Sequence, residues 1–177
     1  MEPDRPMEDV EFTRIDRCLI ELSCRLVELL ELRGLSVVTA ESCTGGLVAA
    51  VLSEAPGAGT ALHGGFVVYS KDQKAGALGV PHDLIARHGA VSETVACAMA
   101  NGALARSNAD IAVAVTGVAG PAPDEDGTPV GVMHFAAVRR GRGLLHIARD
   151  FGNAGHSACR YAAVRETLAL VRQAAEL

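Results

Sequence analysis

Residues 35–55 have the sequence LSVVTAESCTGGLVAAVLSEA, which contains the pattern of a strand, a turn and a helix. The first six residues, Leu35–Ala40, form a short run rich in β-branched side chains, which is typical of a strand. The segment ESCTGG consists of small and turn-forming residues, and the helical stretch LVAAVLSEA follows it directly. A strand that enters a helix through a tight turn is a basic unit of α/β proteins. The sequence therefore predicts an α/β fold around this unit.

Further strands and helices alternate on both sides of this unit. Helices are expected from Ile15 to Gly34, from Pro81 to Ile85, from Ser92 to Ser107 and at the C-terminus. Strands are expected over 65–69, 110–115, 130–138 and 144–150, the last two joined as a hairpin by RRGRG. Segment 110–115 is the most apolar, so we expect it at the centre of the sheet. The pattern predicts a three-layer α/β/α sandwich with a mixed, mostly parallel sheet of about five strands. We expect a flexible tail over 1–12 and a single domain over 13–177.

The composition disfavours several classes of protein. Apolar residues make up 49% and charged residues 21% of the 177 residues, which is enough to bury a core. The formal net charge is -5, so we expect no nucleic-acid partner. No apolar run approaches the roughly 18 residues that a membrane span needs, and the acidic N-terminus differs from a signal peptide. We therefore expect a cytoplasmic protein without membrane association.

The cysteines and histidines do not have the spacing of metal ligands. The 5 cysteines form no Cys-x-x-Cys pair, and the 6 histidines form no i,i+4 pair. The acidic residues 124–126 resemble part of a calcium loop without its downstream glutamate, so a solvated loop is expected there. We predict reduced thiols, no metal site and no cofactor.

Polar residues follow three of the predicted strands at their carboxyl ends, where α/β sheets bind ligands. They are Ser42, Tyr69 with Lys71 and Lys74 behind it, and Thr116 with Gly117. Ser42 is either a nucleophile or the N-cap of the helix that follows. Because ESCTGG is not the G-x-S-x-G motif and brings no histidine with it, a base for Ser42 would have to be a lysine. Lys74 either takes this role or is a solvated surface charge.

The residues around Ser42 also leave alternatives open. Tyr69 either bridges Ser42 and Lys74, stacks on an aromatic ligand or is an amphipathic core residue. Thr116 is either a hydrogen-bond donor in the site or a turn residue. Cys43 is expected to be a buried thiol that points away from Ser42. Backbone N–H groups of the turn would cradle a phosphate or stabilise an oxyanion, namely those of Thr44, Gly45 and Gly46.

Four segments occur together and in order: TAESCTGGL (39–47), GGFVVYSKDQKAGALGV (64–80), HGAVSETVACAMANGAL (88–104) and ADIAVAVTGVAGP (109–121). Together they closely resemble the C-terminal domain of the CinA family, the nicotinamide-nucleotide amidases, over roughly residues 15–175. The resemblance implies an α/β/α fold and hydrolysis of the carboxamide of nicotinamide mononucleotide (NMN), giving nicotinate mononucleotide and ammonia. It implies that Ser42 is the nucleophile, that Lys74 or a Tyr69–Lys74 relay is the base, and that Thr116 is an active-site residue. The chain resembles a stand-alone form of this domain.

One segment departs from the family pattern. The family has F-x-G-D-R-x-x-V-R before its last helix, whereas residues 151–160 are FGNAGHSACR. Alignment on Arg160 puts His156 where the active-site arginine of the family belongs, so we expect His156 to contact the substrate. In the alternative, Arg160 or another group does so. This departure also keeps open a second function, a catalytically weak or silent module that binds a nucleotide or a protein partner. A homodimer is left open as well.

Overall fold

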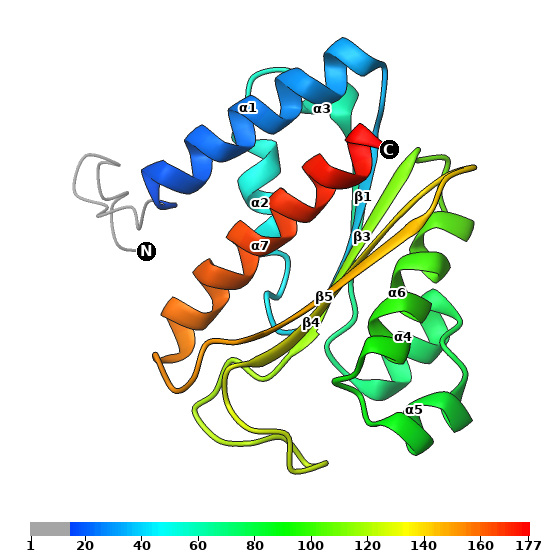
Figure 1. Ribbon diagram of the computed structural model, residues 1–177, viewed down its shortest axis with the longest axis vertical. Helices are drawn as coiled ribbons and strands as arrows, with labels where there is room; N and C mark the ends of the chain where they lie inside the picture. Colours follow the sequence, from blue (N-terminus) through cyan, green and yellow to red (C-terminus); the bar gives the residue numbers. More distant parts are fainter. Residues whose placement is uncertain (1–14) are drawn as a thin grey trace, which may run out of the picture.

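The computed structural model describes residues 15–177 and confirms an α/β fold built on a five-stranded sheet (Figure 1). The spatial order is β2 (Leu62–Val67), β1 (Val37–Glu41), β3 (Ile111–Gly117), β4 (Val132–Arg139) and β5 (Leu144–Asp150). β1 pairs in parallel with β2 and β3, whereas β4 is antiparallel to β3 and to β5. All strands except β4 therefore point in the same direction, as predicted for a mixed, mostly parallel sheet. The tail expected over 1–12 lies outside the described residues.

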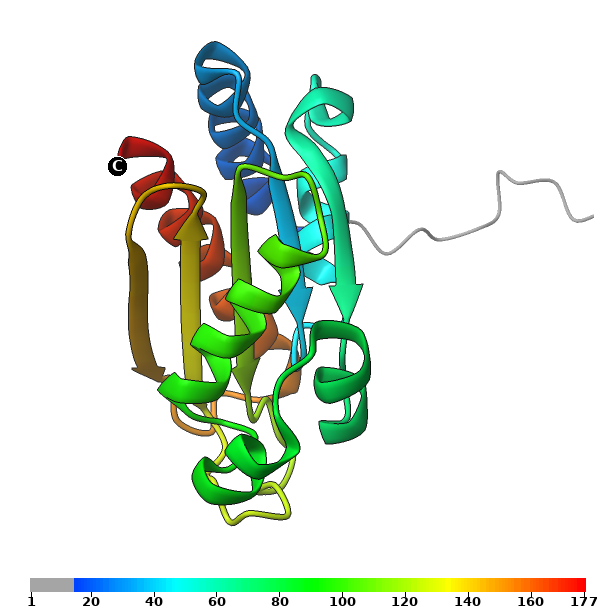
Figure 2. The same ribbon diagram turned by 90° about the vertical axis from the view of Figure 1, so that its right-hand side faces the viewer.

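Helices cover both faces of the sheet and produce the predicted three layers. One face carries α1 (Arg17–Arg33), α2 (Leu47–Ser53), α3 (Ala58–Ala61) and α7 (His156–Glu176). The other face carries α4 (Lys71–Leu78), α5 (His82–His88) and α6 (Glu93–Ala105), as Figure 2 shows. Buried side chains form two apolar clusters, one on each side of the sheet. Over residues 15–177, each helix is too short or too polar to cross a membrane.

β3 lies at the centre of the sheet, and both of its faces are buried. Ile111, Val113 and Val115 belong to the cluster beneath α1 and α7, while Ala112 and Ala114 belong to the cluster beneath α6. Side chains alternate between faces along a strand, so the larger residues fill one layer and the smaller ones the other. This arrangement accounts for the uninterrupted apolar run that predicted a central strand.

The loop after β2 continues into α4, a helix that the sequence analysis did not predict. Ser70 caps its first turn by accepting a hydrogen bond from Gln73 N at 3.1 Å, and Gly79 ends it with a φ of 70°. α4 packs closely on α6 because Gly102 has no side chain, and a Cβ there would collide with the carbonyl oxygen of Leu78. This contact fixes α4, and with it Lys74, against the rest of the layer.

Other boundaries differ from the prediction by a few residues. β2 occupies Leu62–Val67 instead of 65–69, so Val68 and Tyr69 lie in the loop beyond the strand. α5 extends to His88, three residues beyond the expected end. Gly34 ends α1 in the left-handed conformation, and residues 140–143 connect the β4–β5 hairpin, both as predicted.

Candidate active site

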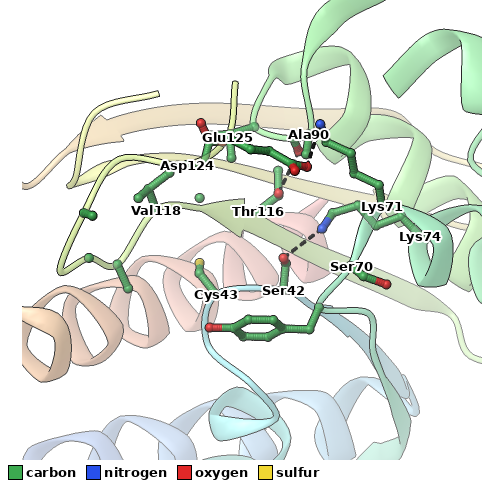
Figure 3. Close-up of a pocket in the computed structure, with 16 residues that line it drawn as sticks. Ser42, Cys43, Ser70, Lys71, Lys74, Ala90, Thr116, Val118, Asp124 and Glu125 are labelled. Carbon is green, nitrogen blue, oxygen red and sulfur yellow. Dashed lines mark hydrogen bonds and ion pairs between the residues drawn. The ribbon is translucent and has the colours of Figure 1, made fainter. Parts of the chain in front are cut away.

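A pocket of about 410 Å³ opens at the carboxyl ends of β1, β2 and β3 (Figure 3). Ser42 lies just beyond β1, Tyr69 follows β2, Lys74 is on α4, and Thr116 and Gly117 end β3. The remaining wall consists of Cys43, Ser70 and Lys71, of residues 90–91 before α6 and of the loop that follows β3. The three polar groups that the sequence analysis placed at neighbouring strand ends therefore share one pocket.

Ser42 and Lys74 form a hydrogen-bonded pair in this pocket. Lys74 Nζ donates to Ser42 Oγ at 2.8 Å and to the carbonyl oxygen of Val68 at 3.2 Å. In Figure 3 the two side chains point toward each other from α4 and from the end of β1. Both are buried, with 2% of Lys74 and 6% of Ser42 exposed. Lys74 is thus not a solvated surface charge.

Burial changes the acid–base behaviour of Lys74. Its pKa is lowered from 10.5 to about 8, mainly by loss of hydration; Cys43 opposes this shift, and the nearby positive charge of Lys71 contributes to it. A lysine with such a pKa has a fraction of neutral amine near neutral pH, and a neutral amine can accept a proton from a hydroxyl. The geometry and the pKa together suit a serine nucleophile with a lysine base.

Cys43 is buried beside Ser42 and has the properties of an unreactive thiol. Burial raises its pKa to about 12, so the thiolate is not populated near neutral pH. Its Sγ lies 3.9 Å from Sδ of Met133, in the core beneath α1 and α7. These features agree with the expected buried thiol.

Tyr69 and Thr116 lie at the pocket in different environments. Tyr69 is 68% exposed, and among the described residues its hydroxyl makes no hydrogen bond to Ser42 or Lys74. Thr116 is fully buried and donates from Oγ1 to the carbonyl oxygen of Ala90 at 2.8 Å, which ties the end of β3 to the segment before α6. Gly117 packs on Met133, where a Cβ would collide with the side chain.

The structure does not bring the turn residues Thr44, Gly45 and Gly46 to the lining of the pocket. Thr44 Oγ1 and the N–H groups of Val48 and Ala49 all donate to the carboxylate of Glu41. Gly45 N donates to the carbonyl oxygen of Ser42 at 3.0 Å. Glu41 therefore occupies the start of α2 through Val48 and Ala49, and a role for the N–H groups of Thr44, Gly45 and Gly46 toward an anion stays a prediction.

His156 also lies away from the pocket. It is the first residue of α7, is exposed, and is not among the residues that line the pocket. Arg160, one helical turn later, reaches the Ser42 turn instead and donates from Nη2 to the carbonyl oxygen of Thr44 at 2.7 Å. Arg160 thus contacts the turn that contains Ser42 but does not line the pocket, and contact of either residue with the substrate stays a prediction.

Over residues 15–177, no group of three or more histidine, cysteine, aspartate or glutamate side chains has the arrangement of a metal site. His134 and His146 stack with ring centroids 5.3 Å apart, and Glu93 lies 3.6 Å from His146. These three side chains lie on β4, β5 and α6, outside the residues that line the pocket.

Comparisons with known proteins identify the family. The family model described as the CinA C-terminal domain matches residues 20–175, which is most of the chain. The chain belongs to the CinA family. The nicotinamide-nucleotide amidohydrolase PncC of Escherichia coli K12 is 45% identical over 130 residues, which cover 73% of this chain and 79% of the relative. A CinA-like protein of Chlorobium luteolum is 49% identical over 115 residues, 65% of this chain but only 27% of that longer relative.

Solved structures of CinA proteins have the same fold. The competence/damage inducible protein CihA of Agrobacterium tumefaciens is similar with a TM-score of 0.88 and 40% sequence identity, over 94% of this chain and all 100% of that one. A CinA superfamily protein of Escherichia coli gives a TM-score of 0.83 at 32% identity, over 98% of this chain. The α/β/α fold of the CinA domain is therefore shared by this chain.

One residue of this CinA domain was missed by the sequence analysis, and a second was named there without its partners. The first is Glu41, whose carboxylate is buried directly before Ser42. The second is Lys71, whose Nζ lies 2.8 Å from Glu125 and 2.7 Å from Asp126, so that it ties the acidic loop after β3 to α4. Hydrogen bonds to Asp126 and Glu125 raise the pKa of Lys71, which keeps a positive charge at the mouth of the pocket. The sequence signal for Lys71 was its spacing of three residues from Lys74, which is informative only once the segment is known to be helical.

Proposed function

We propose that this chain is an amidase that hydrolyses the carboxamide of NMN to nicotinate mononucleotide and ammonia. The observation that carries the proposal is the 2.8 Å contact between Lys74 Nζ and Ser42 Oγ in the pocket. The similarity to a nicotinamide-nucleotide amidohydrolase supports the choice of substrate. A pocket of about 410 Å³ is within the range of small-molecule sites.

In the first half of the reaction, Lys74 acts as the base for Ser42. The neutral amine takes the hydroxyl proton while Oγ attacks the carboxamide carbon and forms a tetrahedral intermediate. The carbon–nitrogen bond then breaks, and the Lys74 ammonium returns the proton to the departing nitrogen, which leaves as ammonia. An ester between Ser42 and the nicotinoyl group of the nucleotide remains.

In the second half, water hydrolyses this ester. Lys74 accepts a proton from the water as its oxygen attacks the ester carbon, and returns a proton to Ser42 Oγ as the ester bond breaks. Nicotinate mononucleotide is released with Ser42 and Lys74 in their starting states. The cycle consumes one water and needs no redox step.

Tyr69 suits contact with the substrate better than a proton relay. Its ring lines the pocket and is 68% exposed, and no hydrogen bond links its hydroxyl to Ser42 or Lys74. An exposed aromatic ring beside the nucleophile can stack on the pyridine ring of the nucleotide. In this proposal Tyr69 positions the substrate, and Lys74 alone exchanges protons with Ser42.

The test is ammonia release by the purified protein, with nicotinamide and nicotinamide riboside as comparison substrates. We expect equal amounts of ammonia and nicotinate mononucleotide from NMN, with slower release from both smaller amides. NMN that binds without releasing ammonia would instead favour the second candidate, a catalytically silent nucleotide-binding module. The exposed position of His156, which leaves the family's arginine without a counterpart there, is the observation that favours this alternative. Cytoplasmic location stays a prediction from the sequence, and a homodimer stays open.

A further inference from the structure

We infer that Glu41 is a positioning residue of the amidase reaction: its buried carboxylate holds the turn that presents Ser42 to Lys74. The inference rests on the proposed function, since it concerns the same nucleophile. Glu41 does not line the pocket, so it would act through the backbone of the turn and not by touching the substrate.

The carboxylate of Glu41 is 1% exposed and receives four hydrogen bonds. Oε1 accepts from Thr39 Oγ1 at 3.1 Å and from Ala49 N at 2.9 Å. Oε2 accepts from Thr44 Oγ1 at 2.8 Å and from Val48 N at 3.0 Å. Every partner is a donor, so the site fits an ionised carboxylate and leaves neither oxygen unpaired.

The turn depends on this carboxylate because α2 has no other side-chain cap. Gly46 occupies the N-cap position with a φ of 92° and has no side chain to accept a hydrogen bond from the first turn. Glu41 supplies the missing acceptor from the end of β1, and its negative charge lies at the positive end of the helix dipole. A single side chain thereby joins the last residue of β1 to the start of α2 across the five residues that contain Ser42.

The alternation of side chains along β1 explains why Glu41 and Ser42 have different roles. Thr39 and Glu41 point to the side of the sheet that α2 covers, so Ser42 points to the opposite side, where α4 carries Lys74. Ser42 N also donates to the carbonyl oxygen of Val115 at 3.0 Å, which ties the turn to β3. Glu41 thus holds the turn from behind while Ser42 faces the pocket.

The experiment compares Glu41→Gln with a matched control, Asp110→Asn. Asp110 is also a carboxylate that joins two strands, accepting from Ser36 N and Ser36 Oγ, both at 2.8 Å, but it lies before β3, at the opposite ends of the strands from the pocket. Glutamine keeps the shape of Glu41 and turns an NH2 group toward donors, so the turn must shift. We expect Glu41→Gln to lower kcat for NMN by about 10- to 100-fold with little change in KM, because small displacements of reacting groups have effects of this size. Asp110→Asn should lower the thermal midpoint and leave kcat within about twofold.

Two further readouts separate positioning from a general loss of structure. A fluorophosphonate phosphonylates Ser42 Oγ with release of fluoride. The rate of this reaction, measured against pH, should fall in Glu41→Gln while the midpoint of its pH profile stays where the wild type has it, since Lys74 is untouched. If Glu41→Gln does not fold, Thr44→Val replaces it in the test, because it removes one of the four donors and keeps the side-chain shape. Thr44→Val should show a smaller loss of the same kind. Unchanged kcat in folded Glu41→Gln, or a lower melting temperature with a normal rate of phosphonylation, would overturn the inference. Because phosphonylation of Ser42 needs no NMN, failure of the wild type to hydrolyse NMN would contradict the proposed function and leave this test of Glu41 intact.

Discussion

The pairing of Ser42 with a buried amine makes a specific prediction about pH. Burial holds the pKa of Lys74 at about 8, and only the neutral amine can accept the serine proton. We expect kcat/KM for NMN to rise with pH through about 8 and then level off. Lys71→Gln should move this rise to higher pH, because it removes the positive charge that lowers the pKa of Lys74. A flat profile between about pH 6 and 9 would argue against Lys74 as the base.

The same burial implies that Lys74 lowers the free energy of unfolding. Its pKa is 10.5 in the unfolded chain and about 8 when folded, so the folded state loses stability as pH falls from 10.5 to about 8 and stays penalised below. Lys74→Met should therefore abolish activity and raise the free energy of unfolding at pH 7 by up to about 3 kcal/mol. Urea unfolding of both proteins at pH 7 and pH 10 tests this, since the advantage of the methionine variant should shrink at pH 10. A destabilised methionine variant would mean that the hydrogen bonds of Lys74 outweigh its desolvation.

At the scale of elements, the close contact between α4 and α6 positions Lys74. Because a Cβ on Gly102 would collide with the carbonyl oxygen of Leu78, Gly102→Ala should push the two helices apart, with a cost of about 1 to 3 kcal/mol in stability and a loss of kcat. Gly76→Ala is the matched control, because a Cβ on this glycine of α4 meets no atom within 4 Å. It should raise stability by about 0.5 to 1 kcal/mol and preserve activity. Equal effects of the two substitutions would contradict the packing argument.

A second contact between elements, the stacked histidine pair, should make the fold sensitive to acid. Burial lowers the pKa of His134 below 6.5, and the neighbouring His146 lowers it further, against an opposing influence from Glu93. Since the unfolded chain binds the proton more readily, the free energy of unfolding should fall below about pH 6.5, by at most about 1.4 kcal/mol per pH unit. His134→Gln should reduce this slope, whereas His82→Gln, at an exposed histidine of α5, should not. Identical slopes in the three proteins would show that other groups cause the acid sensitivity.

For the whole molecule, the order of the elements and the place of the pocket were predictable from the sequence. The turn between Ala40 and Leu47 and the apolar run of β3 indicated an α/β sheet with β3 in its middle. The carboxyl ends of neighbouring parallel strands lie at one edge, so the approach of Ser42 to the segment after β2 followed from topology alone. The 2.8 Å contact between Ser42 Oγ and Lys74 Nζ could not be predicted, because it depends on where α4 begins.

Three features lay beyond the sequence analysis for physical reasons. α4 has a polar sequence without an amphipathic period, and its position depends on the Ser70 cap and on contact with α6. A carboxylate is ordinarily expected at the surface, so the burial of Glu41 is understandable only when the N–H groups of α2 are in place. Alignment by motif put His156 in the site. In the structure α7 begins at His156, and Arg160, four residues further along this helix, contacts the loop that contains Ser42.

The central claim is that Ser42 and Lys74 act as one catalytic unit on the carboxamide of NMN. The measurement that tests it most directly is ammonia release from NMN at pH 8 by the wild type, Ser42→Ala, Lys74→Ala and the double variant, each with its fold verified by thermal unfolding. We predict that kcat falls by several orders of magnitude in either single variant and that the double variant is little worse, because residues that act as a unit are strongly non-additive. Near-normal ammonia release by Ser42→Ala, or losses that multiply in the double variant, would contradict the account.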